Sequence, residues 1–182
     1  MQMARKSKSK EKYPHLESFL EETLEAWRDV RSGIISEVEN IPEDKFDFRP
    51  TPEMRSVREL IWHILEVSMM MTGELTRPDT NMKRLPWPDL LEKYASAAYQ
   101  AKSKRELLDI LASQMDDAER KFRAAGDLAL WQFMERFDGL PGTKVQWLHH
   151  GISQEMYHRG QLTVYARLMG LVPALTQVIQ GM

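Results

Sequence analysis

Apolar residues recur at three- and four-residue steps near the start of the chain, a spacing typical of an amphipathic helix. The apolar positions are Leu16, Phe19, Leu20, Leu24, Trp27, Val30, Ile34 and Val38. Charged residues stand between them and are expected to face solvent: Glu21, Glu22, Glu25, Arg28 and Arg31. The pattern predicts one long helix from Leu16 to Val38.

Three further helices are predicted from the residues at which they start and stop. Each start is a capping box, in which a Ser or Thr and a Glu or Gln three residues later each bond a backbone amide of the other residue. The boxes are Ser56–Glu59, Ser103–Glu106 and Thr143–Gln146. These helices are expected to end at about Thr76, at Gly126 and at Gly170.

The segments between these helices are long and contain proline and aromatic residues. In RPDTNMKRLPWPDLLEKYASAAYQAK a short helix is expected from Asp89 to about Lys102, and IPEDKFDFRPTPEMR is expected to form a structured loop. In DLALWQFMERFDGLPG no strand-like alternation occurs, and its aromatic residues are expected to cover one end and limit access of water. The chain is therefore predicted to be all-α, a four-helix bundle with long connections between helices two and three and between helices three and four.

Composition supports one domain and narrows its partners. The 182 residues are 42% hydrophobic, enough for a single core over residues 15–182, whereas residues 1–14 are basic and are expected to form a disordered tail. A net charge of −2 favours neither nucleic acid nor anionic lipid. No apolar run suits a membrane span, and cysteine is absent, so a cytoplasmic protein without a thiol of its own is expected.

Polar residues interrupt an otherwise apolar seam of the last predicted helix. At a period of 3.5 residues this seam contains Trp147, Gly151, Gln154, His158, Gln161, Tyr165 and Leu168. Buried polar groups need partners or a function, so the seam is a candidate site. His63, in the apolar run ELIWHILE of the second helix, is expected to face it.

His63, Gln154 and His158 form the group with the best geometry for binding an ion. Residues four apart on a helix lie ~6 Å apart along its axis, so Gln154 and His158 can converge on one ion. His150 and His158 lie ~12 Å apart, too far to share a metal. The pocket around the group is expected to contain His150, Gln161, Glu66 and Tyr165.

The chemistry of this group leaves two interpretations open. A metal bound by His63, His158 and Gln154 would keep coordination positions open to water or substrate. An amide oxygen is a poorer donor than imidazole to late first-row ions, so such a site would be weak. Alternatively, Gln154 and Gln161 satisfy the two histidines in a metal-free hydrogen-bond network.

A glycine in the middle of the same helix requires its own explanation. Gly160 stands among helical residues, although glycine weakens a helix interior by ~1 kcal/mol relative to alanine. Close approach of another helix beside His158 would account for it, because glycine leaves room for a neighbouring backbone.

Two stretches resemble the DinB/YfiT-like family of bacterial four-helix proteins. They are PTPEMRSVRELIWHILE and FDGLPGTKVQWLHHGISQEMYHRGQLTVYARLMG, and the order of helices from about Leu16 to Gly170 agrees with the family. In that family a divalent metal is typically held by one histidine of helix two and two of helix four, the latter in His-x-x-x-His-Arg-Gly-Gln. The resemblance places His63 and His158 at the first and last ligands and Gln154 at the middle histidine.

The resemblance also implies what such a site does. Some relatives are thiol-dependent transferases or isomerases, in which the metal lowers the pKa of a small-molecule thiol such as bacillithiol or mycothiol. The implied cofactor is a divalent ion, Zn, Ni or Fe, and the implied partners are a small-molecule ligand or thiol cosubstrate and a second copy of the chain. The other interpretation is a non-catalytic, metal-free bundle that binds a small ligand or a protein partner, with Gln154 marking a degenerate metal site.

Overall fold

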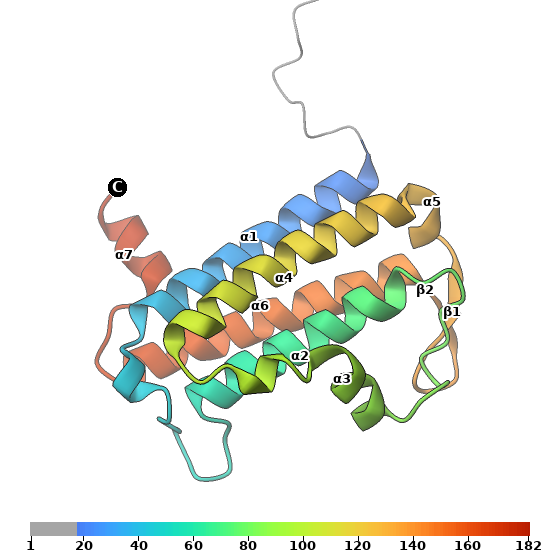
Figure 1. Cartoon of the computed structure of the whole chain (residues 1–182). Coiled ribbons are helices and arrows are strands. Elements are labelled where there is room, and N and C mark those ends of the chain that lie inside the picture. Colours follow the sequence, from blue (N-terminus) through green and yellow to red (C-terminus); the bar gives the residue numbers. More distant parts are fainter. Residues whose placement is uncertain (1–17) are drawn as a thin grey trace, which may run out of the picture.

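Four long helices lie side by side in the computed structural model, which describes residues 18–182 (Figure 1). They are α1 (Phe19–Asn40), α2 (Val57–Leu75), α4 (Lys104–Ala125) and α6 (Lys144–Leu168). Shorter elements lie in the connections and at the C-terminus: η1 (Glu43–Lys45), α3 (Trp87–Ala95), η2 (Ala98–Gln100), α5 (Asp127–Leu130), β1 (Phe133–Glu135), β2 (Pro141–Thr143) and α7 (Ala174–Gln180). The predicted four-helix bundle is confirmed.

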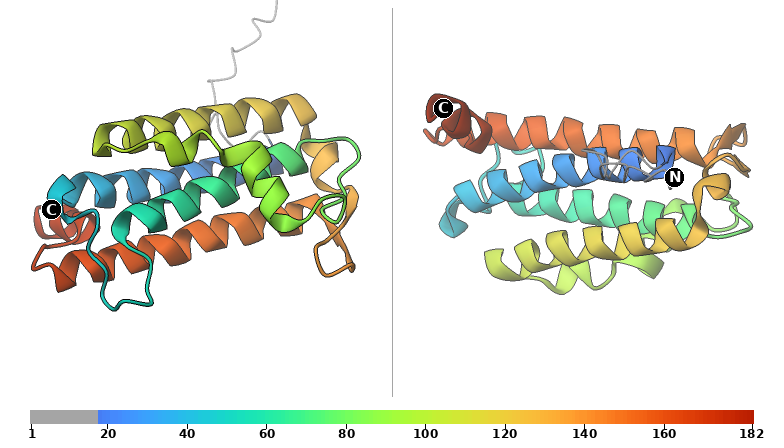
Figure 2. Two further views of the ribbon diagram at one scale, coloured as in Figure 1. Left: turned by 60° about the horizontal axis from the view of Figure 1, so that its bottom comes forward. Right: turned by 90° about the horizontal axis from the view of Figure 1, so that it is seen from above.

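The long helices occupy the corners of a square. Both α1 and α2 pack against α4 and α6, so α1 and α2 are diagonal to each other. Helices α1 and α6 run in one direction and α2 and α4 in the other (Figures 1 and 2). Because α2 ends at the opposite end of the bundle from the start of α4, a crossover of residues 76–103 is needed, and it contains α3.

The predicted caps account for where the long helices start. The Ser56 hydroxyl accepts a hydrogen bond from the Glu59 amide at 3.2 Å, and the Glu59 carboxylate accepts one from the Ser56 amide at 2.9 Å. Ser103 begins α4 with the same reciprocal pair, whereas Thr143 supplies only the first half of the box to α6. The boundaries predicted for these helices therefore agree with the structure to within two residues.

Two predictions about the remaining segments need correction, and one further helix lies outside every prediction. Helix α3 starts at Trp87, because a proline is tolerated in the first turn, and it ends at Ala95 instead of Lys102. The segment expected to lack strands forms a hairpin in which Phe133 pairs with Thr143; three-residue strands are too short to show alternation. Helix α7 follows Pro173, and no sequence pattern predicts it. Leu16 and the predicted tail, residues 1–14, lie outside the described residues.

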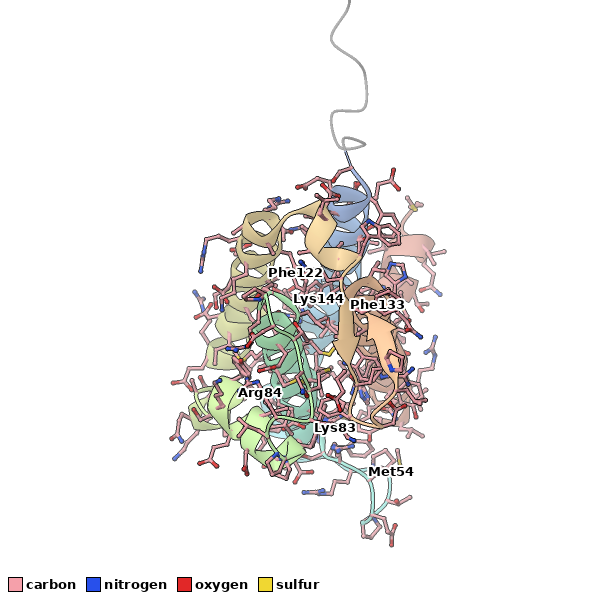
Figure 3. All side chains as sticks on the ribbon, turned by 90° about the vertical axis from the view of Figure 1, so that its right-hand side faces the viewer. Met54, Lys83, Arg84, Phe122, Phe133 and Lys144 are labelled. Carbon is pink, nitrogen blue, oxygen red and sulfur yellow. The ribbon has the colours of Figure 1, made fainter. Side chains whose placement is uncertain are left out.

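The core consists of two apolar clusters, one toward each end of the bundle. One cluster contains Trp27, Met70 and Phe122, and the other contains Ile34, Ile61 and Tyr165. Lys144, 1% exposed, closes the end that carries the hairpin (Figure 3). Its ammonium group donates to the Gln132 side chain at 3.0 Å, and burial lowers the pKa of this lysine.

A polar layer separates the two clusters and joins all four long helices. Arg31 of α1 is 1% exposed and donates to Glu155 of α6, at 3.0 Å from Nε and 2.6 Å from Nη2. It also donates to Ser68 of α2 at 2.8 Å and to Gln114 of α4 at 2.6 Å. The expectation that Arg31 faces solvent is wrong, because a buried carboxylate partner compensates its charge.

Candidate functional site

His63 of α2 and His158 of α6 face each other inside the bundle, as the sequence predicts. Their ring centroids lie 4.9 Å apart with the rings nearly perpendicular, at 82°. Gln154 lies one turn before His158, and its side-chain amide donates to Nε2 of His63 at 3.2 Å. The structure therefore brings together all three residues of the predicted group.

Hydrogen bonds fix the tautomer of both imidazoles. Nδ1 of His63 donates to the Glu66 carboxylate at 2.5 Å, and Nδ1 of His158 donates to Oε1 of Gln161 at 2.7 Å. A ring that donates from Nδ1 keeps the lone pair on Nε2 when it is neutral. Glu66 and Gln161 thus act as the outer partners that typically orient a ligating histidine.

Burial and hydrogen bonding set the charge states of His158 and Glu66. His158 is 6% exposed, and burial lowers its pKa below the usual value; the charges of His63 and Arg55 lower this pKa further, against the hydrogen bond of Gln161. Burial raises the pKa of Glu66, but the hydrogen bonds from His63 and Tyr99 outweigh burial and leave that pKa below its usual value. At neutral pH the site therefore holds a neutral His158, and Glu66, on the far side of His63, is ionised.

His63 and His158 suit a divalent ion as ligands, and Gln154 would be a weak third ligand. Two imidazoles that bind one ion through Nε2 at ~2.0–2.1 Å, with bonds ~90–110° apart, bring their centroids to about 4.5–5.2 Å. The 4.9 Å between His63 and His158 lies in this range. The third group, Gln154, is a neutral amide, and residues 18–182 contain no cluster of three His, Cys, Asp or Glu side chains suited to a metal.

An open cavity of about 450 Å³ lies beside Gln161, the hydrogen-bond partner of His158, and neither histidine lines it. Its lining consists of Glu53, Met54, Arg55, Leu60, Gln161 and Tyr165. Tyr165 is buried and donates to the Arg55 carbonyl oxygen at 3.0 Å, which fixes this loop against α6. The volume is within the range of small-molecule sites.

A second, largely enclosed cavity lies between His158 and the polar layer. Its lining includes Ser68, Gln154, Glu155 and His158, and its volume of about 10 Å³ matches roughly one water molecule. Sequence reasoning missed Glu155 and Ser68. A signal existed on α1, where Leu24, Trp27, Arg31 and Ile34 follow one helical face and place the arginine in the apolar row.

Three expectations about the surroundings of the site differ from the structure. His150 is exposed and stacks on Trp147, with centroids 4.7 Å apart, so it does not join the group. Trp131 and Phe133 are 55% and 76% exposed and do not cover the histidines. Near Gly160 no described atom lies within 4 Å of the point that a Cβ would occupy, so close approach within the chain does not explain this glycine.

At Gly151, in the same seam of α6, a side chain of α2 does come close to the helix backbone. A Cβ added there would meet Cε of Met71 at 3.1 Å, tighter than ordinary van der Waals contact. Gly151 therefore allows α6 to lie close to α2 one turn before Gln154, which helps to bring Gln154 within reach of His63.

Four-helix bundles form a class of proteins in which ligand and metal sites are built from side chains on facing helices. The present fold, with two histidines and a glutamine between α2 and α6, places the protein in that class. The chain belongs to the DinB family, whose family model matches residues 6–181.

Solved structures of other proteins share this fold. A DinB-like protein of Bacillus subtilis, YjoA, is 19% identical with a TM-score of 0.63, and the match covers 82% of this chain and 92% of that one. YfiT of Bacillus subtilis, described as a probable metal-dependent hydrolase, is 16% identical with a TM-score of 0.63, over 93% and 94% of the two chains.

A mycothiol-dependent maleylpyruvate isomerase has the same fold over part of its length. It is 15% identical with a TM-score of 0.60, and the match covers 80% of this chain and 61% of that one. No functionally curated protein matches the sequence significantly. Within residues 18–182 no helix is both long and apolar enough to cross a membrane.

Proposed function

We propose that this DinB-family protein is a cytoplasmic enzyme that binds a divalent ion through His63, His158 and, more weakly, Gln154. The observation that carries the proposal is the pair of Nδ1 hydrogen bonds to Glu66 and Gln161. They leave the lone pairs of both Nε2 atoms on rings whose separation suits one shared ion. Zn, Ni or Fe are the ions that imidazole donors suit.

The bound ion would supply Lewis-acid activation of a water molecule or of a thiol cosubstrate. The chain itself would orient the ligating imidazoles and keep them buried away from bulk water. Glu66 and Gln161 hold the imidazoles in place, and burial keeps His158 neutral and able to donate its lone pair. Small-molecule thiol transfer is the reaction class we favour, because the sequence contains no cysteine and the nucleophile would arrive as a cosubstrate.

The open cavity beside Gln161 is the proposed place for the substrate. Arg55 lines this cavity, and no acidic side chain among the described residues forms an ion pair with it. Glu53, the other charged residue of the lining, is held by hydrogen bonds in its own loop, which lower its pKa. An unpaired guanidinium favours a substrate that carries a carboxylate or a similar oxyanion.

A second candidate function is a metal-free site that binds a small ligand or a protein partner. The hydrogen bond from Gln154 to Nε2 of His63, at 3.2 Å, favours it, because this bond uses the lone pair that a metal would need. In this case the histidines, Gln154 and Gln161 form a self-contained buried network.

Metal analysis of the purified protein distinguishes the two functions. The chain is purified without an affinity tag, and its metal content is measured by mass spectrometry for the wild type, His63→Ala, Gln154→His and a control, His149→Ala. His149 is exposed on α6, outside the site. We expect metal in the wild type, loss in His63→Ala, tighter retention in Gln154→His and no change in the control.

Each outcome has a definite meaning. Metal that only Gln154→His retains would favour the metal-free candidate, with Gln154 as the cause of the loss. Metal in neither protein would contradict the inference that His63 and His158 present their Nε2 atoms to one ion. Equal metal in the wild type and His63→Ala would place the ion elsewhere in the chain.

A further inference from the structure

Four large apolar side chains protrude into solvent at the end of the bundle that carries the hairpin. We define the end patch by its residues Phe19, Leu128, Trp131 and Phe133. These residues are 41%, 85%, 55% and 76% exposed, in that order. Figure 3 looks onto this end of the bundle and labels Phe133. The four side chains neither cover the histidine pair nor fill the core, so the end patch requires a different explanation.

Contacts between α1 and the connection that follows α4 hold the end patch together. The rings of Phe19 and Trp131 lie 5.5 Å apart. The Trp131 amide donates to the Leu128 carbonyl oxygen at 3.3 Å, which closes a turn that carries both side chains. Phe133 follows two residues later, where β1 begins. The end patch is therefore built by the fold and is not a set of scattered exposed residues.

Charged residues are absent from the segment that forms most of the end patch. From Leu128 to Met134 the sequence is LALWQFM. The preceding residue, Asp127, directs its carboxylate into the fold, where it accepts a hydrogen bond from the Leu20 amide at 3.0 Å. At their observed exposures the four side chains of the end patch present roughly 500 Å², in the upper part of the range of about 300–600 Å² for the largest apolar patch on a monomer.

The chain carries a concentration of positive charge next to this patch. Residues 1–12, MQMARKSKSKEK, contain five Lys or Arg and one Glu. The whole chain has a net charge of −2, so residues 13–182 contain more acidic than basic residues. Lys12 precedes Phe19 by only seven residues, so the chain itself ties the basic segment to the end patch.

We propose that the protein docks with this end on an anionic membrane surface, with the end patch in the lipid interface and residues 1–12 at the headgroups. Aromatic and leucine side chains enter the boundary between headgroups and acyl chains, and a basic segment adds attraction to anionic lipid. One small apolar anchor gives only marginal membrane binding, and a polybasic segment supplies the second signal that stable binding needs.

Two further features favour a membrane over a nucleic acid as the partner. Leu128 is the most exposed residue of the end patch, and an aliphatic side chain suits acyl chains better than it suits stacked bases. The acidic remainder of the chain is repelled by an anionic surface, so the basic segment and the end patch turn toward that surface. The proposal concerns the end of the bundle and does not depend on a metal at His63 and His158.

Co-sedimentation with lipid vesicles tests the proposal. The full chain is mixed with phosphatidylcholine vesicles that contain about 30% phosphatidylserine and with vesicles of phosphatidylcholine alone. We expect binding to the anionic vesicles about a hundredfold tighter or more, and weaker as the salt concentration rises. A single-stranded oligonucleotide is tested in parallel as the other anionic partner.

A matched pair of variants tests the end patch. Phe133→Ser should weaken binding to the anionic vesicles about tenfold or more, because it removes a large apolar side chain from the lipid interface. Leu128→Ser should have a similar effect. The control is Ile179→Ser, because Ile179 is 63% exposed on α7 at the opposite end of the bundle (Figure 1) and should leave binding unchanged.

A second pair of variants tests the basic segment. Replacing three of its lysines by serine should weaken binding to the anionic vesicles about tenfold or more; these are Lys6, Lys8 and Lys10. The control replaces three exposed basic residues near η1 and the start of α4, at the opposite end, and should bind as the wild type does; these are Lys45, Lys102 and Arg105.

Three outcomes overturn the proposal. The first is a wild type that binds neither kind of vesicle or binds both equally. The second is vesicle binding that Phe133→Ser and Leu128→Ser weaken no more than Ile179→Ser does. The third is tighter binding to the oligonucleotide than to the anionic vesicles, which would assign the basic segment to a nucleic acid.

Discussion

The polar layer around Arg31 makes a strong prediction about stability. Replacing Arg31 by methionine keeps most of the side-chain volume but removes the charge and every donor. Arg31 supplies hydrogen bonds to Glu155, Ser68 and Gln114 and to the Leu111 carbonyl oxygen. After the change Glu155, 4% exposed, keeps one side-chain hydrogen bond within residues 18–182, from the Trp27 indole at 2.8 Å.

The expected cost follows from the charge that remains. Removing one partner of a buried ion pair leaves an uncompensated charge and typically costs about 3–5 kcal/mol. Solvent screens this pair only weakly, since both side chains are 5% exposed or less. A domain is usually stable by only about 5–15 kcal/mol, so Arg31→Met should remove a large part of the stability.

Urea unfolding of a double-mutant cycle measures the effect. Arg31→Met, Glu155→Met and the combined variant are compared with the wild type, and the double variant should recover most of the loss because neither charge is then buried alone. Ser32→Met, at the exposed position next along α1, is the control for the added side chain. A loss below about 1 kcal/mol in Arg31→Met, or strictly additive losses, would refute the buried charge pair.

Three further predictions concern packing, pH and ligand binding. Gly151→Val should lower the free energy of unfolding by about 1–3 kcal/mol, because its side chain would meet Met71, and urea unfolding measures this. Burial raises the pKa of Glu119, but the hydrogen bonds and charges of Arg28 and Arg123 outweigh burial and leave the folded pKa below its ordinary value of 4.5. The stabilisation that Glu119 provides is therefore lost as the pH falls through this folded pKa, and Glu119→Gln should flatten the pH dependence of the free energy of unfolding. Arg55→Gln should weaken binding of short carboxylates about tenfold or more in thermal-shift titrations.

Controls accompany the packing and ligand-binding predictions, and contradicting outcomes accompany the packing and pH predictions. Ser113→Val, exposed on α4, should leave unfolding unchanged, and an equal loss in both valine variants would remove the packing argument. An unaltered pH profile in Glu119→Gln would mean that the pair with Arg28 and Arg123 is not stabilising. Arg105→Gln, 84% exposed on α4, should bind carboxylates as the wild type does.

The features that the sequence predicts correctly depend on local chemistry. The capping residues Ser56 and Ser103 mark where helices begin because a side chain and an amide three residues apart must bond. His63 and His158 are expected to meet because each interrupts an apolar run, and a bundle leaves one interior to receive both. Periodicity thus identifies the faces that become buried.

The features that sequence reasoning misses depend on contacts between distant segments. Assigning Arg31 to the surface treats its charge as decisive, although its partner Glu155 lies 124 residues further along the chain. Gly160 and Gly151 look alike in the sequence, and only the position of Met71 distinguishes the close approach from the open one. Strands β1 and β2 are each three residues long, which is too short for any period to be recognised.

The layer that contains Arg31 also bears on how such a chain can change length. Inserting or deleting one residue in a helix rotates the residues that follow by ~100° around the helix axis. A single such change in any of the long helices would therefore turn that helix's member of the layer away from its hydrogen-bond partners. Residues 76–103 and 126–143 contribute nothing to the layer and are free of this constraint. We expect natural gains and losses of length to be tolerated in these two connections. Insertions and deletions should be absent from the helices around the layer, which are residues 27–34 of α1 and the turns that contain Ser68, Gln114 and Glu155.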